Sequence, residues 1–197
     1  MKQILIATKN KGKVREFKDF FREYGITVHS LLDLGESIPD IEETGNTFEE
    51  NAALKAEKIA VLLNKPVLAD DSGLIVDALD GRPGIFSARY AGEGKSDSDN
   101  NQKLLSELKE IPEAKRTARF ICVLAVAVPG EKTIFRTGYS EGKIGFAPQG
   151  TNGFGYDPLF IPDGYEKTMA ELSPTVKNSI SHRSNAIKKL ENWVIQL

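Results

Sequence analysis

Apolar positions along the chain follow two different spacings, and these spacings predict where strands and helices lie. The short apolar run 3–7 is typical of a buried strand. Val14, Phe17, Phe21 and Tyr24 then recur at helical spacing, which predicts a helix over 13–24. The same reasoning predicts further strands at 26–31, 66–69, 74–77, 118–128, 133–144 and 157–161, and further helices at 47–63, 97–109 and 184–196.

The order of these elements predicts the fold class. Strands and helices alternate at the start of the chain, whereas the turn 129–132 joins two long strands directly. A tight hairpin cannot belong to a wholly parallel sheet, so the sequence predicts an α/β protein with a central mixed β-sheet flanked by helices. The length of 197 residues favours one domain over 1–197, or two lobes that share one sheet.

Composition and charge exclude several classes of function. The formal net charge is −2, so we do not expect nucleic-acid binding through bulk positive charge, and any phosphate site must be local. No apolar run reaches the roughly 18–20 residues of a membrane span, and the start at Met1 lacks the longer apolar region of a secretory signal. The single cysteine, Cys122, lies in an apolar run, which favours a packing role and a reducing, cytoplasmic compartment.

The polar turn Thr8-Lys9-Asn10-Lys11-Gly12-Lys13 lies between the first predicted strand and the first helix. The N–H groups at a helix N-terminus favour an anion, and here they lie beside three lysines and a glycine that permits close backbone approach. The glycine spacing and the Lys-Ser/Thr pair of a P-loop are missing, which argues against a kinase or a P-loop NTPase. Two interpretations stay open: a phosphate site, or a capped helix start with solvated lysines.

The segment Asp70-Asp71-Ser72-Gly73 places two adjacent carboxylates between apolar strand segments and is expected to form an acidic turn. Buried carboxylates are costly unless they are paired or bind a metal, and Mg²⁺ commonly joins carboxylates to substrate phosphates. Because side chains alternate along a strand, Asp70 and Asp71 are expected to face different ways. The segment is a candidate metal site, and an ordinary Asp-Ser-Gly turn is the alternative.

One lysine lies on the apolar side of the second predicted helix. Thr47-Phe48-Glu49-Glu50 fits a capping box that starts this helix, and the loop 40–45 before it supplies further carboxylates. Lys55 falls inside the apolar arc that contains Ala52 and Ile59. Such a lysine must either extend its ammonium to water or contact a carboxylate or phosphate, and both alternatives stay open.

Two segments near the C-terminus carry donors and aromatic rings. The glycine-rich loop 150–157 contains Phe154 and Tyr156, which suit a flat ligand because an aromatic face stacks on a base. Lys177-Asn178-Ser179-Ile180-Ser181-His182-Arg183 then offers several hydrogen-bond donors in quick succession. The two histidines of the chain cannot make a histidine-rich zinc site.

Several of these segments match the motifs of one known family in the right order, over residues 8–183. The matching segments are Thr8–Lys13, Glu43–Phe48, Asn51-Ala52, Leu54–Ala56, Ala69–Leu74, Pro83–Tyr90, Gly153–Pro158 and Ser181–Arg183. In these residues the chain resembles the inosine triphosphate pyrophosphatase family, which removes nonstandard purine nucleotides. The resemblance implies an elongated α/β fold with two lobes and the active site in the cleft between them, assembled as a homodimer.

The resemblance also implies roles for individual residues. Thr8–Lys13 would bind the triphosphate of a purine nucleoside triphosphate, with the assistance of Lys55. Glu43 and Asp71 would hold Mg²⁺, and Asp71 would accept a proton from the attacking water. The nucleotide itself would contact Ser72, Phe154, Gly155, Tyr156, Asp157, Lys177, His182 and Arg183, with Phe154 stacked on the purine.

The implied reaction is hydrolysis of ITP, dITP and XTP to the monophosphate and pyrophosphate. Donors at Lys177, His182 and Arg183 suit the 6-keto group of these bases better than the amino group of adenine. Two alternatives stay open. One is a related pyrophosphatase that acts on modified pyrimidine or methylated nucleotides, and the other is a nucleotide sensor without hydrolysis.

Overall fold

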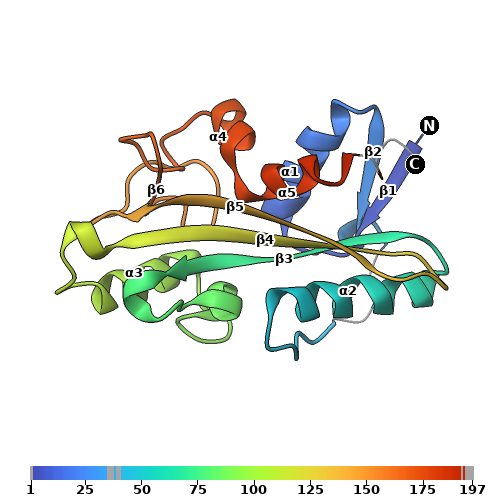
Figure 1. Ribbon diagram of the computed structural model, residues 1–197, viewed down its shortest axis with the longest axis horizontal. Helices are drawn as coiled ribbons and strands as arrows, with labels where there is room; N and C mark the ends of the chain where they lie inside the picture. The colour runs from blue at the N-terminus through green and yellow to red at the C-terminus, as the bar shows by residue number, and fades with distance from the viewer. Residues whose placement is uncertain (1, 35–37, 39–40, 192, 194–197) are drawn as a thin grey trace. The chain divides into compact units, whose positions relative to one another are not determined.

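The computed structural model describes residues 2–34, 38, 41–191 and 193 (Figure 1). The strands are β1 (Lys2–Ile6), β2 (Ile26–Ser30), β3 (Val67–Val76), β4 (Thr117–Ala127), β5 (Ile134–Ile144) and β6 (Phe160–Pro162). The α-helices are α1 (Lys11–Arg22), α2 (Phe48–Leu63), α3 (Asp97–Glu107), α4 (Pro174–Ile180) and α5 (His182–Lys188). Short 3₁₀ turns are η1 (Leu31–Asp33), η3 (Asp77–Leu79), η4 (Gly84–Arg89) and η5 (Glu113–Lys115).

The strands form one mixed sheet, which confirms the predicted fold class. Its hydrogen-bonded order is β2-β1-β3-β4-β5-β6. β1 pairs in parallel with β2 and with β3, because helical crossovers connect them, whereas β5 and β6 are antiparallel. In the part of the chain that the structure describes, no helix is long and apolar enough to cross a membrane.

The chain divides into two compact units, and each has its own apolar core. Unit 1 comprises residues 1–71, 122–138 and 186–197, and unit 2 comprises residues 72–121 and 139–185. In unit 1, Phe17 and Phe21 of α1 pack with Ile187 of α5 against the strands, while α2 covers the other face (Figure 1). In unit 2, Leu104 of α3 packs with Phe160 of β6.

The acidic segment is not a turn, and this corrects the prediction of two short strands at 66–69 and 74–77. β3 is one continuous strand from Val67 to Val76, and both aspartates lie buried inside it. A strand can continue through two buried carboxylates when each has a cationic partner, since pairing offsets the cost of their burial. Lys13 and Lys55 are these partners, and neither contact can be read from local sequence.

The helix predicted at 97–109 is present as α3, with Asn100, Asn101 and Leu104 buried. Two further element predictions were wrong in their details. The last predicted helix begins at His182 as α5, and the short helix α4 before it was missed. Proline at the first position and a serine cap explain α4, because Ser173 accepts a hydrogen bond from the N–H of Val176. The last residues of the predicted helix, and part of the acidic loop 32–45, lie outside the described residues.

Candidate active site

The polar turn before α1 is a capped helix start. Asn10 Oδ1 accepts a hydrogen bond from the N–H of Lys13 at 3.0 Å, and the N–H of Asn10 donates to Thr8 Oγ1 at 3.2 Å. The helix therefore begins at Lys11, two residues before the predicted start, because Asn10 is the cap. Capping does not exclude an anion, since it uses one of the N–H groups that a helix start exposes. The phosphate-binding role of residues 8–13 stays a prediction.

Lys13 has a partner that the sequence did not reveal. Its ammonium lies 3.1 Å from Asp70 Oδ2, and the carboxylate of Asp70 is fully buried. The thiol of Cys122 lies 4.0 Å from the same oxygen atom. Asp70 is thus a buried counter-ion that ties the start of α1 to β3, rather than a residue that shapes a turn.

Asp71 faces a different partner, as the alternation of strand side chains predicts. The ammonium of Lys55 lies 3.2 Å from Asp71 Oδ1 and 2.6 Å from Glu43 Oε1. Lys55 therefore finds carboxylates instead of extending to water, which decides between the two sequence alternatives. The two carboxylates that the resemblance assigns to a metal are held together by one ammonium group.

The electrostatics of this cluster favour an additional cation. Three carboxylates, of Glu43, Asp70 and Asp71, face the two ammonium groups of Lys13 and Lys55. Burial raises the pKa of Asp71 above its ordinary value, although Lys55 and Lys13 oppose the shift. Burial tends to lower the pKa of Lys55, but the nearby carboxylates, Asp71 first, raise it. The lysine thus stays charged, and burial disfavours the charged form of Asp71.

The loop that carries Glu43 is fixed to the start of α2. The N–H of Gly45 donates to Asn51 Oδ1 at 2.8 Å, and the N–H of Asn46 donates to Glu50 Oε2 at 2.6 Å. Thr47 caps the helix by accepting from the N–H of Glu50 at 3.1 Å, which confirms that half of the predicted capping box. The Glu50 side chain accepts from Asn46 instead of Thr47, so the reciprocal half is not formed. Asn51 is wholly buried, and no local signal in the sequence pointed to its role as a loop anchor.

The residues present fit Mg²⁺. Asp71 Oδ2 is buried and has no hydrogen-bond partner among the described residues, so it is an oxygen that still requires a donor or a cation. Mg²⁺ usually takes one or two carboxylates and completes its shell with water and substrate phosphates. Within the described parts of the chain no group of three or more His, Cys, Asp and Glu side chains could hold a metal. Two carboxylates would leave coordination positions for water and substrate phosphates.

In unit 2 the glycine-rich loop is organised around a buried ion pair. Asp157 Oδ2 accepts hydrogen bonds from Lys177 Nζ at 2.5 Å and from the N–H of Phe154 at 2.9 Å. The ammonium of Lys177 also lies 5.0 Å from the ring centroid of Phe154. Gly153 is required here, because a Cβ atom would lie 2.0 Å from Asp157 Oδ2. The structure thus brings Phe154, Asp157 and Lys177 together, as predicted.

His182 and Arg183 are buried rather than exposed at a polar helix start. The ring of His182 stacks on Phe120, with centroids 4.8 Å apart and planes at 17°. The guanidinium of Arg183 donates to Ser72 Oγ at 3.0 Å, and only 2% of Arg183 is exposed. A buried donor is costly when it has no partner. A site lined by such donors therefore favours a ligand that accepts hydrogen bonds and rejects one that cannot.

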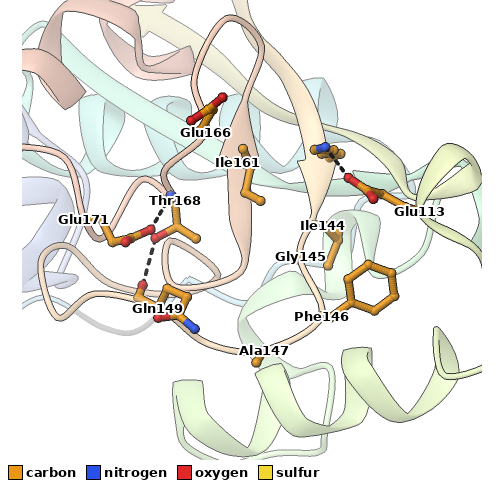
Figure 2. A pocket seen from close by; sticks show the side chains of 11 residues that line it. Glu113, Ile144, Gly145, Phe146, Ala147, Gln149, Ile161, Glu166, Thr168 and Glu171 are labelled. Atoms are coloured by element: carbon orange, nitrogen blue, oxygen red, sulfur yellow. Dashed lines mark hydrogen bonds and ion pairs between the residues drawn. The ribbon is translucent and has the colours of Figure 1, made fainter.

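A pocket of about 270 Å³ in unit 2 contains none of the predicted site residues (Figure 2). It lies beside the end of β5 and β6, and its walls include Ile144, Phe146 and Ile161. Polar groups of the wall bond to one another, since the N–H of Thr168 donates to Glu171 and its hydroxyl donates to the carbonyl of Gln149. Because none of the predicted site residues lines this pocket, it is not part of the candidate active site.

Comparisons with known proteins agree over nearly the whole chain. The sequence model of the Ham1 family matches residues 4–193. A dITP/XTP pyrophosphatase of Oceanobacillus iheyensis is 62% identical over 194 residues, which cover 98% of each chain. The solved Ham1 protein of Staphylococcus aureus is 48% identical, with a TM-score of 0.86 over 99% of each chain. The solved HAM1 protein of Coxiella burnetii is 40% identical, with a TM-score of 0.88 over 100% of each chain. The match to the family model therefore includes all of unit 2 and all but the terminal residues of unit 1.

Proposed function

The chain belongs to the Ham1 family, and we propose that it hydrolyses dITP, XTP and ITP to the nucleoside monophosphate and pyrophosphate. The enzyme class is that of relatives such as the dITP/XTP pyrophosphatase of Oceanobacillus iheyensis. The observation that carries the proposal is the partly buried cluster in which Lys55 contacts both Glu43 and Asp71, while Asp71 Oδ2 has no hydrogen-bond partner among the described residues. A nucleotide sensor has no need for this costly arrangement.

In this proposal, unit 1 supplies the groups for the triphosphate and the metal. The start of α1 and its lysines bind phosphate oxygens through N–H groups and positive charge. Glu43 and Asp71 hold Mg²⁺, which neutralises phosphate charge when it is bound. Water adds to a phosphorus atom of the α–β anhydride, and the bond from that phosphorus to the bridging oxygen breaks. Asp71 orients the water, while Lys55 stabilises the charge on the departing group.

Unit 2 supplies the groups for the base. Phe154 offers an aromatic face, and the bond to Asp157 holds the ammonium of Lys177 near that face. An ammonium carries three N–H donors and no acceptor, so it suits a keto oxygen and opposes an amino group. Selection of 6-keto purines would follow from this polarity, together with the donors of His182 and Arg183.

Hydrolysis assays with and without Mg²⁺ test the proposal. We expect dITP, XTP and ITP to be cleaved only with the metal, and pyrophosphate to be released. Release of orthophosphate alone would mean cleavage at the γ-phosphate and would contradict the proposal. Turnover of dUTP above that of the 6-keto purines would favour the pyrimidine alternative, and GTP is the reference for selectivity within the purines.

The homodimer and the cytoplasmic location stay predictions, as does the placement of the substrate in a cleft between two lobes. We propose the dimer on the strength of the resemblance. Light scattering after size-exclusion chromatography would measure its mass, and a single species of about 22 kDa, the mass of one 21.7 kDa chain, would contradict it.

A further inference from the structure

One helix of unit 2 holds both backbone polar groups of a single residue, Gly155, in the glycine-rich loop. The N–H of Gly155 donates to Asp97 Oδ2 at 2.7 Å, and its carbonyl accepts from Asn101 Nδ2 at 3.0 Å. Asp97 and Asn101 are four residues apart, so they lie one above the other on the same side of α3. We call Asp97, Asn101 and Gly155 the α3 clamp.

The α3 clamp acts next to the aromatic residue of the loop. The N–H of Phe154 donates to Asp157 Oδ2, and the N–H of Gly155 donates to Asp97. The peptide groups on both sides of the Phe154 Cα are therefore fixed by hydrogen bonds, and the direction of the Phe154 Cα–Cβ bond is fixed with them. Gly155 has φ +61°, a conformation that a residue with a side chain adopts only with strain.

The helix that carries the clamp is itself firmly anchored. Its first turn has a capping box between Ser96 and Asp99, and Leu104 packs in the core of unit 2. Asn100 holds a second loop, because it accepts from the N–H of Ala91 and donates to the carbonyl of Ala88. Consecutive asparagines are poor helix formers, and burial adds to their cost, so their side-chain contacts explain their presence.

We propose that Asp97 and Asn101 are positioning residues that hold Phe154 in the orientation that stacks on the purine base. This inference rests on the proposed function, because it needs a purine nucleotide as ligand. Neither residue touches the base in this proposal, and each acts through Gly155. The clamp should therefore affect base binding and leave the groups of unit 1 unchanged.

Binding of inosine monophosphate to the full chain, measured by calorimetry, tests the clamp. Asn101→Asp removes the donor with little change in shape, and we expect Kd to rise about 5- to 10-fold. Asp97→Ala should have a similar effect, whereas Asp97→Asn keeps an acceptor and should stay within about twofold of the original chain. Ser98→Ala changes an exposed side chain in the same turn and is the matched control. Melting temperatures show that each variant is folded.

A double-mutant comparison separates positioning from a merely structural role. Phe154→Ala removes the ring, so adding Asn101→Asp to it should raise Kd less than about twofold further. Inhibition by inorganic tripolyphosphate, which lacks a base, should be the same in all folded variants. If the fold-increases in Kd of Asn101→Asp and Phe154→Ala multiplied in the double variant, the two residues would act independently and the inference would be overturned. A Kd unchanged by Asn101→Asp alone would overturn it as well. Failure of the original chain to bind inosine monophosphate would also overturn this inference, whereas the proposed function is overturned only if the original chain does not hydrolyse ITP to pyrophosphate.

Discussion

The ammonium of Lys55 lies between Glu43 and Asp71 and keeps two acidic groups of unit 1 together. These are the carboxylates that we assign to Mg²⁺, so the lysine and the metal compete for the same oxygens. A lysine in this position stabilises the metal-free protein because it offsets repulsion between the carboxylates. It also lowers the affinity for the metal, and substrate phosphates give the ammonium an alternative partner.

Lys55→Met should therefore have opposite effects on metal binding and on turnover. We expect tighter Mg²⁺ binding without nucleotide, because a competing cation is removed. Turnover should fall about 10²- to 10³-fold, the usual cost of losing a group that stabilises charge in the transition state. Mg²⁺-dependent shifts of the melting temperature and steady-state rates measure both. Lys58→Met, at an exposed position of α2, is the control, and weaker metal binding by Lys55→Met would contradict the competition.

Asp71→Asn should abolish turnover and leave the fold intact. Burial raises the pKa of Asp71, which means that its charged form is disfavoured in the folded protein. Without metal, the variant should therefore be at least as stable as the original chain at pH 7. Lowering the pH neutralises Asp71 in the original chain and removes this cost, so the difference should vanish below the ordinary Asp pKa of about 4.

Calorimetry in a chelator at pH 7 and at lower pH, with assays in Mg²⁺, measures both effects of Asp71→Asn. Substantial retained activity would refute the role of Asp71. A lower melting temperature than that of the original chain at pH 7 would refute the electrostatic argument.

At the scale of elements, the loop before α2 has a tight contact that positions Glu43. A Cβ atom on Gly45 would lie 2.7 Å from Asn51 Oδ1 and 2.7 Å from Glu50 Cβ, so the loop has no room for a methyl group. Asn51 is wholly buried and cannot move away freely. The N-terminal end of α2 thus acts as a platform for the acidic loop.

Gly45→Ala should shift this loop and raise the Mg²⁺ concentration needed for half-maximal activity. The clash should also cost about 1–3 kcal/mol of stability, as overpacking usually does. Titration of activity with Mg²⁺ and denaturant unfolding measure these effects. Glu49→Ala, an exposed change in the first turn of α2, should leave both nearly unchanged. An unchanged Mg²⁺ requirement in Gly45→Ala would show that the loop does not position Glu43.

Local patterns predicted most elements but not the continuity of β3. The spacing of apolar side chains gave α1, α2 and the long strands β4 and β5 to within about two residues. Asp70–Gly73 was assigned to a turn because Asp, Ser and Gly favour turns locally. Partners from α1 and α2 neutralise the two carboxylates, and the strand continues through them.

At the scale of the whole molecule, three strands run through both compact units. The boundary between the units falls inside β3, β4 and β5, although each unit has a separate apolar core. Unfolding one core would break hydrogen bonds between strands that also contribute to the other core. We therefore expect the two units to unfold together.

Core truncations in the two units should lower the same thermal transition. Leu124→Ala removes a buried side chain in unit 1 and Leu159→Ala removes one in unit 2, each at a cost of about 2–5 kcal/mol. Scanning calorimetry should show one peak that moves down in both variants. Val61→Ala, at a position that is 76% exposed, is the control. Two peaks, each moved by only one variant, would show that the units unfold independently.

The sequence by itself determined the fold class, the helix cap at Thr47, and the residues that carry the family resemblance. These features depend on the period of apolar side chains and on residue types within a few positions, so they can be read locally. Only the tertiary structure decided which charged and polar groups meet. Lys13 meets Asp70, Lys55 meets Glu43 and Asp71, and Asp97 of α3 meets the N–H of Gly155. Such pairings join segments that are distant in sequence, because burial makes an unpaired charge or polar group costly wherever the fold places it.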